Sequence, residues 1–232
     1  MNKIKQKPIG IIGGMGPDAS ARLYQLMIKL ARLEYTIKTN EDYPEIVLQS
    51  IPVPEFISDT NMARRAYLMI EDRVNKLINQ NLGCVGISCN TAHMFMDKLR
   101  KKSKAKFVSI LEEVLEQCIQ RGYKRVGLLA TPATHKLKLY EKEFEESGIK
   151  LVVPKKKEIK MLGEIAEKIV VGEINTAEKK LKKIADGLKS KGSEAIILGC
   201  TELPLAFPKN YQLPVLDSVE ILARSLLKRY YQ

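Results

Sequence analysis

The chain has 232 residues, of which 45% are hydrophobic and 28% charged, with 14 glycines and 10 prolines. This composition is ordinary for a globular protein and leaves room for one large domain or two smaller ones. No apolar run reaches the roughly 20 residues of a membrane-spanning helix, and the apolar stretch near the N-terminus, residues 9–12, is too short for a signal peptide. We therefore expect a cytoplasmic protein with no membrane partner.

The formal net charge is +12, and the lysines concentrate in residues 98–106, 154–160 and 178–191. The last two of these runs also contain glutamate, and only 6% of the residues are aromatic. A nucleic-acid site more often combines basic residues with a recognisable module or with stacking aromatic rings. We interpret the lysines as solvated helix faces and expect no nucleic-acid partner, although the positive field would attract an anionic substrate.

Short apolar runs alternate along the chain with amphipathic stretches of helical length. The runs predict strands at residues 8–14, 45–53, 84–89, 106–110, 125–131, 149–154 and 194–200. The amphipathic stretches predict helices at residues 18–35, 61–81, 91–102, 111–122, 133–147, 164–173, 176–191 and 218–231. Asp18 or Ser20 is expected to cap the first helix. Because most strands are wholly apolar, this order predicts an α/β fold whose parallel sheets are flanked by helices.

Two stretches occur twice, in the same order. "IGIIGGMGP" is similar to "VGLLATPAT", which aligns Gly10 with Gly127, and "CVGISCNTAH" is similar to "AIILGCTELP", which aligns Cys89 with Cys200. The repetition predicts two similar half-domains, and we place them at residues 1–102 plus 208–232 and at residues 103–207. Each half then carries a cysteine at the carboxyl end of a parallel strand, the edge at which open α/β sheets bind ligands.

The glycine-rich turn after the first strand has two interpretations. Gly14, Gly16 and Ala19 match the spacing of a dinucleotide fingerprint. However, Pro17 stiffens the turn, and the second strand ends without the acidic residue that binds a ribose. We favour a turn whose backbone N–H groups face a small anion, with Met15 on the pocket wall.

The four cysteines do not make a disulfide framework in a chain of this size. Cys84 lies within a predicted strand and Cys118 within a predicted helix, so both are interpreted as small buried hydrophobic residues. Cys89 and His93 are four residues apart and could share a helix face, as zinc ligands do. No second pair of ligands occurs at metal spacing, so we expect no metal.

Cys89 and Cys200 are different, because each ends a strand and is followed by hydroxyl or amide side chains. A thiol at the start of a helix is expected to have a lowered pKa. Asn90, Thr91 and Thr201 are suited to holding a carboxylate. Packed strand ends explain either cysteine alone equally well, but two matched motifs in two matched halves favour a functional pair.

Two thiols facing one small pocket can invert a stereocentre without a cofactor. One thiolate removes a proton from carbon on one face of the substrate, and the other thiol delivers a proton to the opposite face. Glu202 and His93 lie close in sequence to the two cysteines and could tune them, although capping or surface roles are equally compatible with their positions.

The motifs "IGIIGGMGP", "SCNTAH", "GLLAT" and "GCTELP" together resemble the aspartate/glutamate racemase family over nearly the whole chain. The resemblance implies an isomerase that racemises amino acids without pyridoxal phosphate or another cofactor. It also implies two pseudo-symmetric halves with the active site between them, usually in a homodimer. By position, Cys89 and Cys200 would be the acid/base residues, and the substrate would be bound by Met15, Asn90, Thr91 and Thr201.

Two positions depart from aspartate-specific members of the family. Phe56 stands where those proteins have an arginine, and Val170 stands where they have a lysine, with Lys168 two residues earlier. The racemase chemistry is unaffected, but the side chain of the substrate is left open between aspartate, glutamate and a related amino acid. The alternatives are a related hydantoin racemase, a small-diacid isomerase or decarboxylase, a non-catalytic carboxylate-binding protein, and a regulatory Cys89–Cys200 disulfide.

Overall fold

The computed structural model describes residues 6–54, 56, 60–174 and 176–232. The chain forms two compact units. The first unit comprises Met1–Ser88, Phe95–Ile110 and Leu222–Gln232, and the second comprises Cys89–Met94 and Leu111–Ile221. The segment that begins at Cys89 therefore belongs with the unit that also contains Cys200.

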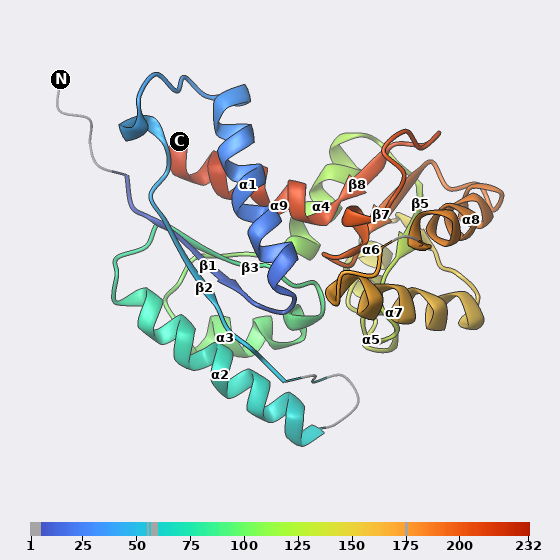
Figure 1. The fold of residues 1–232 in the computed structure, drawn as a ribbon, viewed down its shortest axis with the longest axis horizontal. Helices are drawn as coiled ribbons and strands as arrows, with labels where there is room; N and C mark the ends of the chain where they lie inside the picture. The colour runs from blue at the N-terminus through green and yellow to red at the C-terminus, as the bar shows by residue number, and fades with distance from the viewer. Residues whose placement is uncertain (1–5, 55, 57–59, 175) are drawn as a thin grey trace. The chain divides into compact units, whose positions relative to one another are not determined.

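The first unit is built on a parallel sheet with the strand order β2-β1-β3-β4. Its strands are β1 (Ile9–Gly13), β2 (Ile46–Ser50), β3 (Cys84–Ile87) and β4 (Phe107–Val108). Its helices are α1 (Pro17–Glu34), α2 (Thr60–Ile78), α3 (Met96–Lys102), most of α9 (Ser218–Tyr231) and a short 3-10 turn at Asn40–Asp42. In Figure 1, α1 and α9 lie on one face of this sheet and α2 and α3 on the other.

The second unit repeats the arrangement, with a parallel sheet in the order β6-β5-β7-β8. Its strands are β5 (Arg125–Leu129), β6 (Lys150–Val152), β7 (Ala195–Leu198) and β8 (Val215–Asp217). Its helices are α4 (Ile110–Gln120), α5 (Pro132–Lys136), α6 (Glu141–Glu146), α7 (Lys156–Val170) and α8 (Ala177–Lys189), and 3-10 turns lie at Thr91–Phe95 and Leu203–Leu205. The short strand β8 was not among the predicted strands.

The two sheets share their strand order and their register. Ile9 of β1 pairs with Cys84 of β3, and Val126 of β5 pairs with Ala195 of β7. These pairs are equivalent when Gly10 is aligned with Gly127 and Cys89 with Cys200. The predicted fold class, α/β with two parallel sheets flanked by helices, is confirmed.

The predicted half-domain boundaries, 1–102 plus 208–232 and 103–207, describe a repeat in the sequence and remain a prediction. The compact units divide the chain at other points. Residues 208–221 group with the second unit, because β8 pairs with β7 and extends the second sheet.

The predicted helix at 133–147 is two short helices. α5 ends at Lys136 and α6 begins at Glu141, and Lys138 between them has a φ angle of 49°. This left-handed conformation cannot continue a right-handed helix. The break leaves Tyr140 at the N-cap of α6, where its side chain is completely buried.

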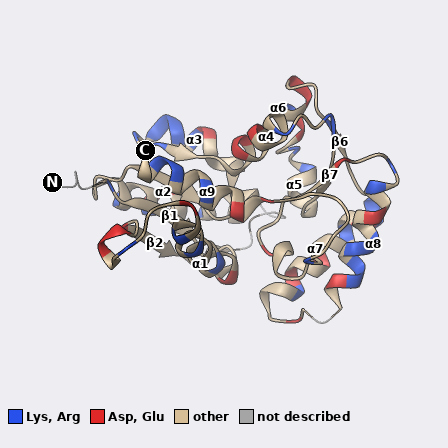
Figure 2. Cartoon of the chain, turned by 90° about the horizontal axis from the view of Figure 1, so that it is seen from above, with Lys and Arg blue, Asp and Glu red and all other residues tan. Residues whose placement is uncertain are grey.

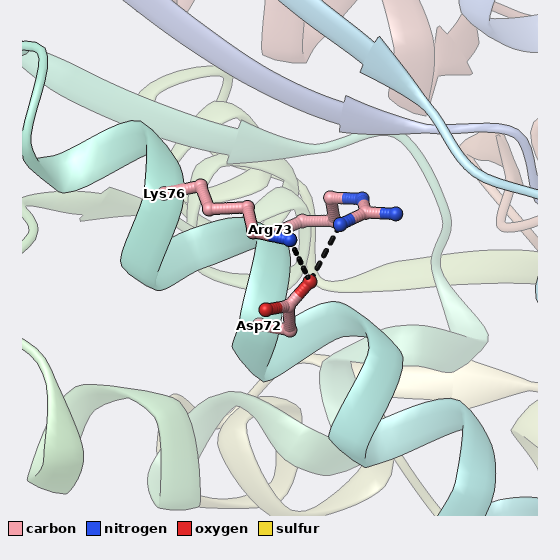
Figure 3. Close-up of polar contacts among 3 residues, drawn as sticks. All are labelled: Asp72, Arg73 and Lys76. Atoms are coloured by element: carbon pink, nitrogen blue, oxygen red, sulfur yellow. Dashed lines mark hydrogen bonds and ion pairs between the residues drawn. The ribbon is translucent and has the colours of Figure 1, made fainter.

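Most lysines of these runs lie on solvated helix faces, as predicted, while Lys104 and Lys106 lie in the exposed stretch between α3 and β4. On α8, Leu181, Ile184 and Leu188 are buried while the intervening lysines are exposed, and Figure 2 shows acidic residues among the basic ones on this helix. On α2, the Asp72 carboxylate accepts hydrogen bonds from Lys76 at 2.8 Å and from Arg73 at 2.5 Å (Figure 3). Exposed ion pairs of this kind contribute little to stability.

Candidate active site

Cys89 and Cys200 occupy equivalent positions, each two residues after the end of a parallel strand. Cys89 follows β3 and Cys200 follows β7. Both side chains are buried, with 7% and 5% exposure, and neither forms a disulfide. Both cysteines belong to the second unit.

The chain after Cys89 forms a 3-10 turn, Thr91–Phe95, before α3 begins at Met96. The predicted helix start is therefore tighter than an α-helix. The backbone N–H groups of Thr91 and Ala92 donate to the Cys89 thiol group. His93 Nδ1 lies 2.8 Å from the carbonyl oxygen of Cys89. Because a carbonyl oxygen only accepts hydrogen bonds, His93 carries a proton on Nδ1 and donates a hydrogen bond to the Cys89 backbone.

Asn90 is bound at both ends of its amide. Its Oδ1 accepts a 2.6 Å hydrogen bond from the Tyr140 hydroxyl group, and its Nδ2 donates to Ser218 Oγ at 3.0 Å. All three side chains are buried. The amide thus ties the residue after Cys89 to the N-cap of α6 and to the first residue of α9.

Thr91 belongs to a cluster of three threonine hydroxyl groups. Its Oγ1 lies 3.1 Å from Thr134 Oγ1 and 3.4 Å from Thr131 Oγ1, and the latter two are 3.2 Å apart. Thr131 is also the N-cap of α5, which follows β5. The cluster therefore connects the turn after Cys89 with the N-terminus of α5.

The Cys200 segment has a carboxylate, Glu202, at the position equivalent to Thr91 in the Cys89 segment. Glu202 Oε2 accepts a hydrogen bond from Cys200 Sγ at 3.0 Å and another from Thr201 Oγ1 at 3.0 Å. Glu202 is buried, with 7% exposure. The carboxylate is consequently placed to take a proton directly from the Cys200 thiol group.

The pKa values of both thiols are raised, contrary to the predicted lowering by a helix start. Burial raises the pKa of Cys89 to about 12, and the Glu202 charge adds to this effect. Burial and the Glu202 carboxylate also hold the pKa of Cys200 well above its usual value. Backbone N–H groups favour the thiolates but do not offset this desolvation. Both groups are therefore thiols at neutral pH.

The glycine-rich turn is held by a serine that was predicted to be a helix cap. α1 instead begins at Pro17 with Gly16 as its N-cap and without a side-chain cap, and neither Asp18 nor Ser20 caps it. Ser20 Oγ accepts from the Gly14 N–H at 2.9 Å and lies 3.2 Å from Ser88 Oγ. Gly14 has a φ angle of 95°, and a Cβ atom there would lie 2.3 Å from the Ile51 carbonyl oxygen. Only glycine fits this turn.

The predicted site residues are thus divided between the two units. Cys89, Asn90, Thr91, Cys200 and Thr201 all lie in the second unit. Met15 lies in the first unit. The roles of all six residues remain predictions.

The two positions that depart from the family pattern have ordinary surroundings. Phe56 is buried, with its ring centroid 5.6 Å from that of Phe95. Val170 is 45% exposed at the end of α7. Lys168 is also exposed, and its Nζ lies 3.9 Å from Glu173.

Four polar residues next to the cysteine segments were not predicted: Thr131, Thr134, Tyr140 and Ser218. The two threonines lie in the repeated motif "VGLLATPAT", so the repeat could have indicated them. Tyr140 and Ser218 lie 50 and 128 residues from Asn90 along the chain, and no local pattern marks them.

Two further structural features can be stated for the described part of the chain. Among those residues, no group of three or more histidine, cysteine, aspartate or glutamate side chains is arranged to hold a metal ion. Within the same residues, no helix is long and apolar enough to cross a membrane.

The chain thus combines a repeated α/β architecture with a buried cysteine after the equivalent strand of each sheet. The family model for Asp/Glu/hydantoin racemases matches residues 12–226. The chain therefore belongs to the Asp/Glu/hydantoin racemase family, and the predicted family and enzyme class, an isomerase, are confirmed.

Individual relatives extend the similarity over nearly the full length. The broad specificity amino-acid racemase RacX of Bacillus subtilis is 24% identical over 226 residues, covering 96% of this chain and 97% of the relative. The crystal structure of an aspartate racemase homologue from Pyrococcus horikoshii matches with a TM-score of 0.82 and 31% identity, covering 97% and 100%. Aspartate racemase from Picrophilus torridus matches with a TM-score of 0.82 and 26% identity, covering 97% and 94%.

Proposed function

We propose that this protein racemises amino acids by moving protons at Cα between two thiols, Cys89 and Cys200, without a cofactor. The observation that supports this most strongly is the equivalent, buried position of the two cysteines after β3 and β7, in a chain of the racemase family. Cys84 and Cys118 are also buried, but they lie within β3 and α4 and have no place in the mechanism.

The proposed reaction begins with a proton transfer inside the second unit. Cys200 passes its proton to Glu202, which leaves a thiolate beside a protonated carboxyl group. The thiolate removes the Cα proton of one enantiomer, and the electron pair remains on carbon as a planar carbanion. Cys89 then donates its thiol proton to the opposite face. The reverse reaction begins with the Cys89 thiolate.

The α-carboxylate of the substrate is proposed to bind to Asn90, Thr91 and Thr201, with Met15 beside it. An amide Nδ2 carries two hydrogens, and the bond from Asn90 to Ser218 uses one of them. Threonine hydroxyl groups can donate to a carboxylate in the same way. The formal net charge of +12 favours the approach of an anionic substrate.

Aspartate and glutamate are the first substrates to test, together with other amino acids. Phe56 offers no charge to a distal carboxylate, and its ring packs on Phe95. Relatives include an aspartate racemase and a broad specificity amino-acid racemase. We therefore propose a substrate range that is not limited to acidic side chains. A hydantoin belongs in the same test because the family description includes hydantoin racemases.

We also propose a reducing, cytoplasmic location and a homodimer. The mechanism needs two reduced thiols, and oxidation of either to a sulfenic acid or disulfide removes the acid or the base. Sedimentation equilibrium would test the dimer directly, with a single species of twice the chain mass of 26.2 kDa as the expected result.

Deuterium incorporation at Cα tests the proposal and the substrate range together. Each enantiomer of aspartate, glutamate, neutral amino acids and a hydantoin is incubated with the protein in heavy water and followed by NMR. We expect deuterium at Cα and the opposite enantiomer as product for at least one substrate. The Cys89→Ala/Cys200→Ala variant should lose both signals, while Cys118→Ala, a matched buried cysteine in the second unit, should keep them.

Two results would contradict the proposal. One is the absence of exchange for every compound, with ligand binding retained in the double variant, which would indicate a non-catalytic carboxylate-binding protein. The other is undiminished racemisation by the double variant.

A further inference from the structure

We propose that Tyr140 is a positioning residue that holds both cysteine segments at once, its hydroxyl group fixing the Cys89 segment and its ring fixing the Cys200 segment. The inference rests on the proposed function for its effect on turnover. The contacts that carry it lie within the second unit.

The hydroxyl group of Tyr140 binds the side chain of Asn90, the residue after Cys89. It donates to Asn90 Oδ1 at 2.6 Å, and the Asn90 amide continues to Ser218. Tyr140 and Ser218 are fully buried and Asn90 is 2% exposed. Because water does not reach these groups, an Asn90 oxygen that loses its donor has no solvent replacement. The Tyr140 hydroxyl group is therefore one of two bonds, with that to Ser218, that fix the amide orientation beside Cys89.

The ring of Tyr140 packs against Gly199, the residue before Cys200. A Cβ atom built on Gly199 would lie 3.2 Å from Tyr140 Cε2 and 2.8 Å from Leu128 Cδ1. The ring thus fills space that a side chain at position 199 would need. Phe144 supports the ring edge-on, with 5.9 Å between centroids. The backbone at Gly199 packs directly against a fixed aromatic surface, and Cys200 is the next residue.

The local fold explains why Tyr140 can serve both segments. Lys138 has a positive φ angle and separates α5 from α6, so Tyr140 stands at an N-cap instead of inside a helix. From there its side chain reaches the two segments that follow β3 and β7. A continuous helix over residues 133–147 would not leave this residue at an end.

Tyr140→Phe removes the hydroxyl group and keeps the ring. We expect kcat to fall about tenfold in both directions of racemisation, because the segment that carries Cys89 is misaligned. KM should rise as well, since the Asn90 amide is one of the groups proposed to bind the substrate carboxylate. In the double variant with Asn90→Ala, removal of the hydroxyl group should have no additional effect, since its only proposed target is gone.

A second measurement does not depend on turnover. The rate at which iodoacetamide alkylates each cysteine is read by peptide mass spectrometry. In Tyr140→Phe we expect Cys89 to react about fivefold faster than in the parent protein, because its segment is less firmly held, while Cys84 is unchanged as an internal reference. Tyr211→Phe is the matched control, since it removes a hydroxyl group bonded to Asp186 in the same unit, and it should alter neither rate.

The outcomes separate this inference from the proposed function. Racemisation within twofold of the parent together with unchanged Cys89 alkylation in Tyr140→Phe would overturn the positioning role. If the parent protein racemises nothing but Cys89 alkylation still rises in the variant, the proposed function fails and the positioning role stands. If Tyr140→Phe does not fold, Ser218→Ala removes the other partner of Asn90 and should produce the same change in Cys89 alkylation; no change would overturn the inference.

Discussion

The two cysteine segments have the same place in the fold and different chemical surroundings. Beside Cys89, the Asn90 amide is bonded to Ser218, and His93 Nδ1 donates to the Cys89 backbone carbonyl group. The Cys200 thiol group donates a hydrogen bond to a carboxylate, that of Glu202. The two cysteines thus share their position after a strand, but the residues that surround their sulfur atoms differ.

This difference indicates unequal roles in the resting protein. Glu202 gives Cys200 a local proton acceptor, whereas the groups around Cys89 secure its backbone. The proposed mechanism needs one thiolate and one thiol at any moment, and an asymmetric pair would provide a route to that state from two neutral thiols.

A fall in pH should lower the free energy of unfolding through His135, which follows Thr134 on α5. Burial lowers the pKa of His135 to about 4, so the ring is neutral and its 4.0 Å contact with Glu141 is not an ion pair at neutral pH. Between pH 6.5 and 4 the unfolded chain binds a proton that the folded chain does not. The free energy of unfolding should therefore fall by about 3 kcal/mol from this residue as the pH falls through that range.

The check is urea unfolding of the parent protein and of His135→Gln at pH 7 and pH 4. The glutamine variant should lose about 3 kcal/mol less than the parent over this interval, while the exposed control Lys136→Gln should follow the parent. Equal losses in His135→Gln and the parent would mean that the histidine is not held neutral by burial.

Alkylation of Cys89 should rise steeply with pH. With a pKa of about 12, the thiolate fraction grows about tenfold per pH unit, so the rate should increase roughly 100-fold between pH 7 and 9. Peptide mass spectrometry after timed exposure to iodoacetamide measures this rate. In urea-unfolded protein the same cysteine should approach a plateau near its ordinary pKa; a plateau below pH 9 in folded protein would contradict the raised pKa.

Replacement of the carboxylate should separate thiol reactivity from turnover. In Glu202→Gln we expect racemisation to fall about 10- to 30-fold, because Cys200 loses its proton acceptor. Alkylation of Cys200 should become faster, since the charge that raises its pKa is gone. Glu178→Gln, on the exposed side of α8, should change neither. Slower alkylation of Cys200, or unchanged turnover, would contradict the assigned role of Glu202.

The smallest effect is expected at His93. His93→Leu removes the donor to the Cys89 carbonyl group, which should reduce turnover about three- to fivefold and leave Cys200 alkylation unchanged. His93→Asn restores a donor at nearly the position of Nδ1 and should recover most of the activity. Equal turnover in the leucine and asparagine variants would show that the hydrogen bond does not matter.

Much of the architecture could be predicted because it depends on local patterns. Apolar runs placed the strands, and the repeated motifs aligned Cys89 with Cys200 in the register that the two sheets share. The break at Lys138 could not be predicted, since a non-glycine residue with positive φ leaves no sequence signal.

The surroundings of the thiols depend on packing between distant residues. Asn90 contacts Tyr140 and Ser218 in the folded second unit, although they lie 50 and 128 residues away along the chain. The predicted lowering of the thiol pKa considered only the groups next to each cysteine in the chain. The actual shift is upward because burial is the largest cause, and burial is a property of the folded unit.

Exchange at Cα in the two single variants tests the two-thiol account most directly. Cys89→Ala and Cys200→Ala are each incubated in heavy water with the L and the D enantiomer of a substrate of the parent protein. We predict that neither variant racemises and that each exchanges the Cα proton of at most one enantiomer, with opposite preference in the two variants. Full racemisation by both variants, or exchange of both enantiomers by either one, would contradict it.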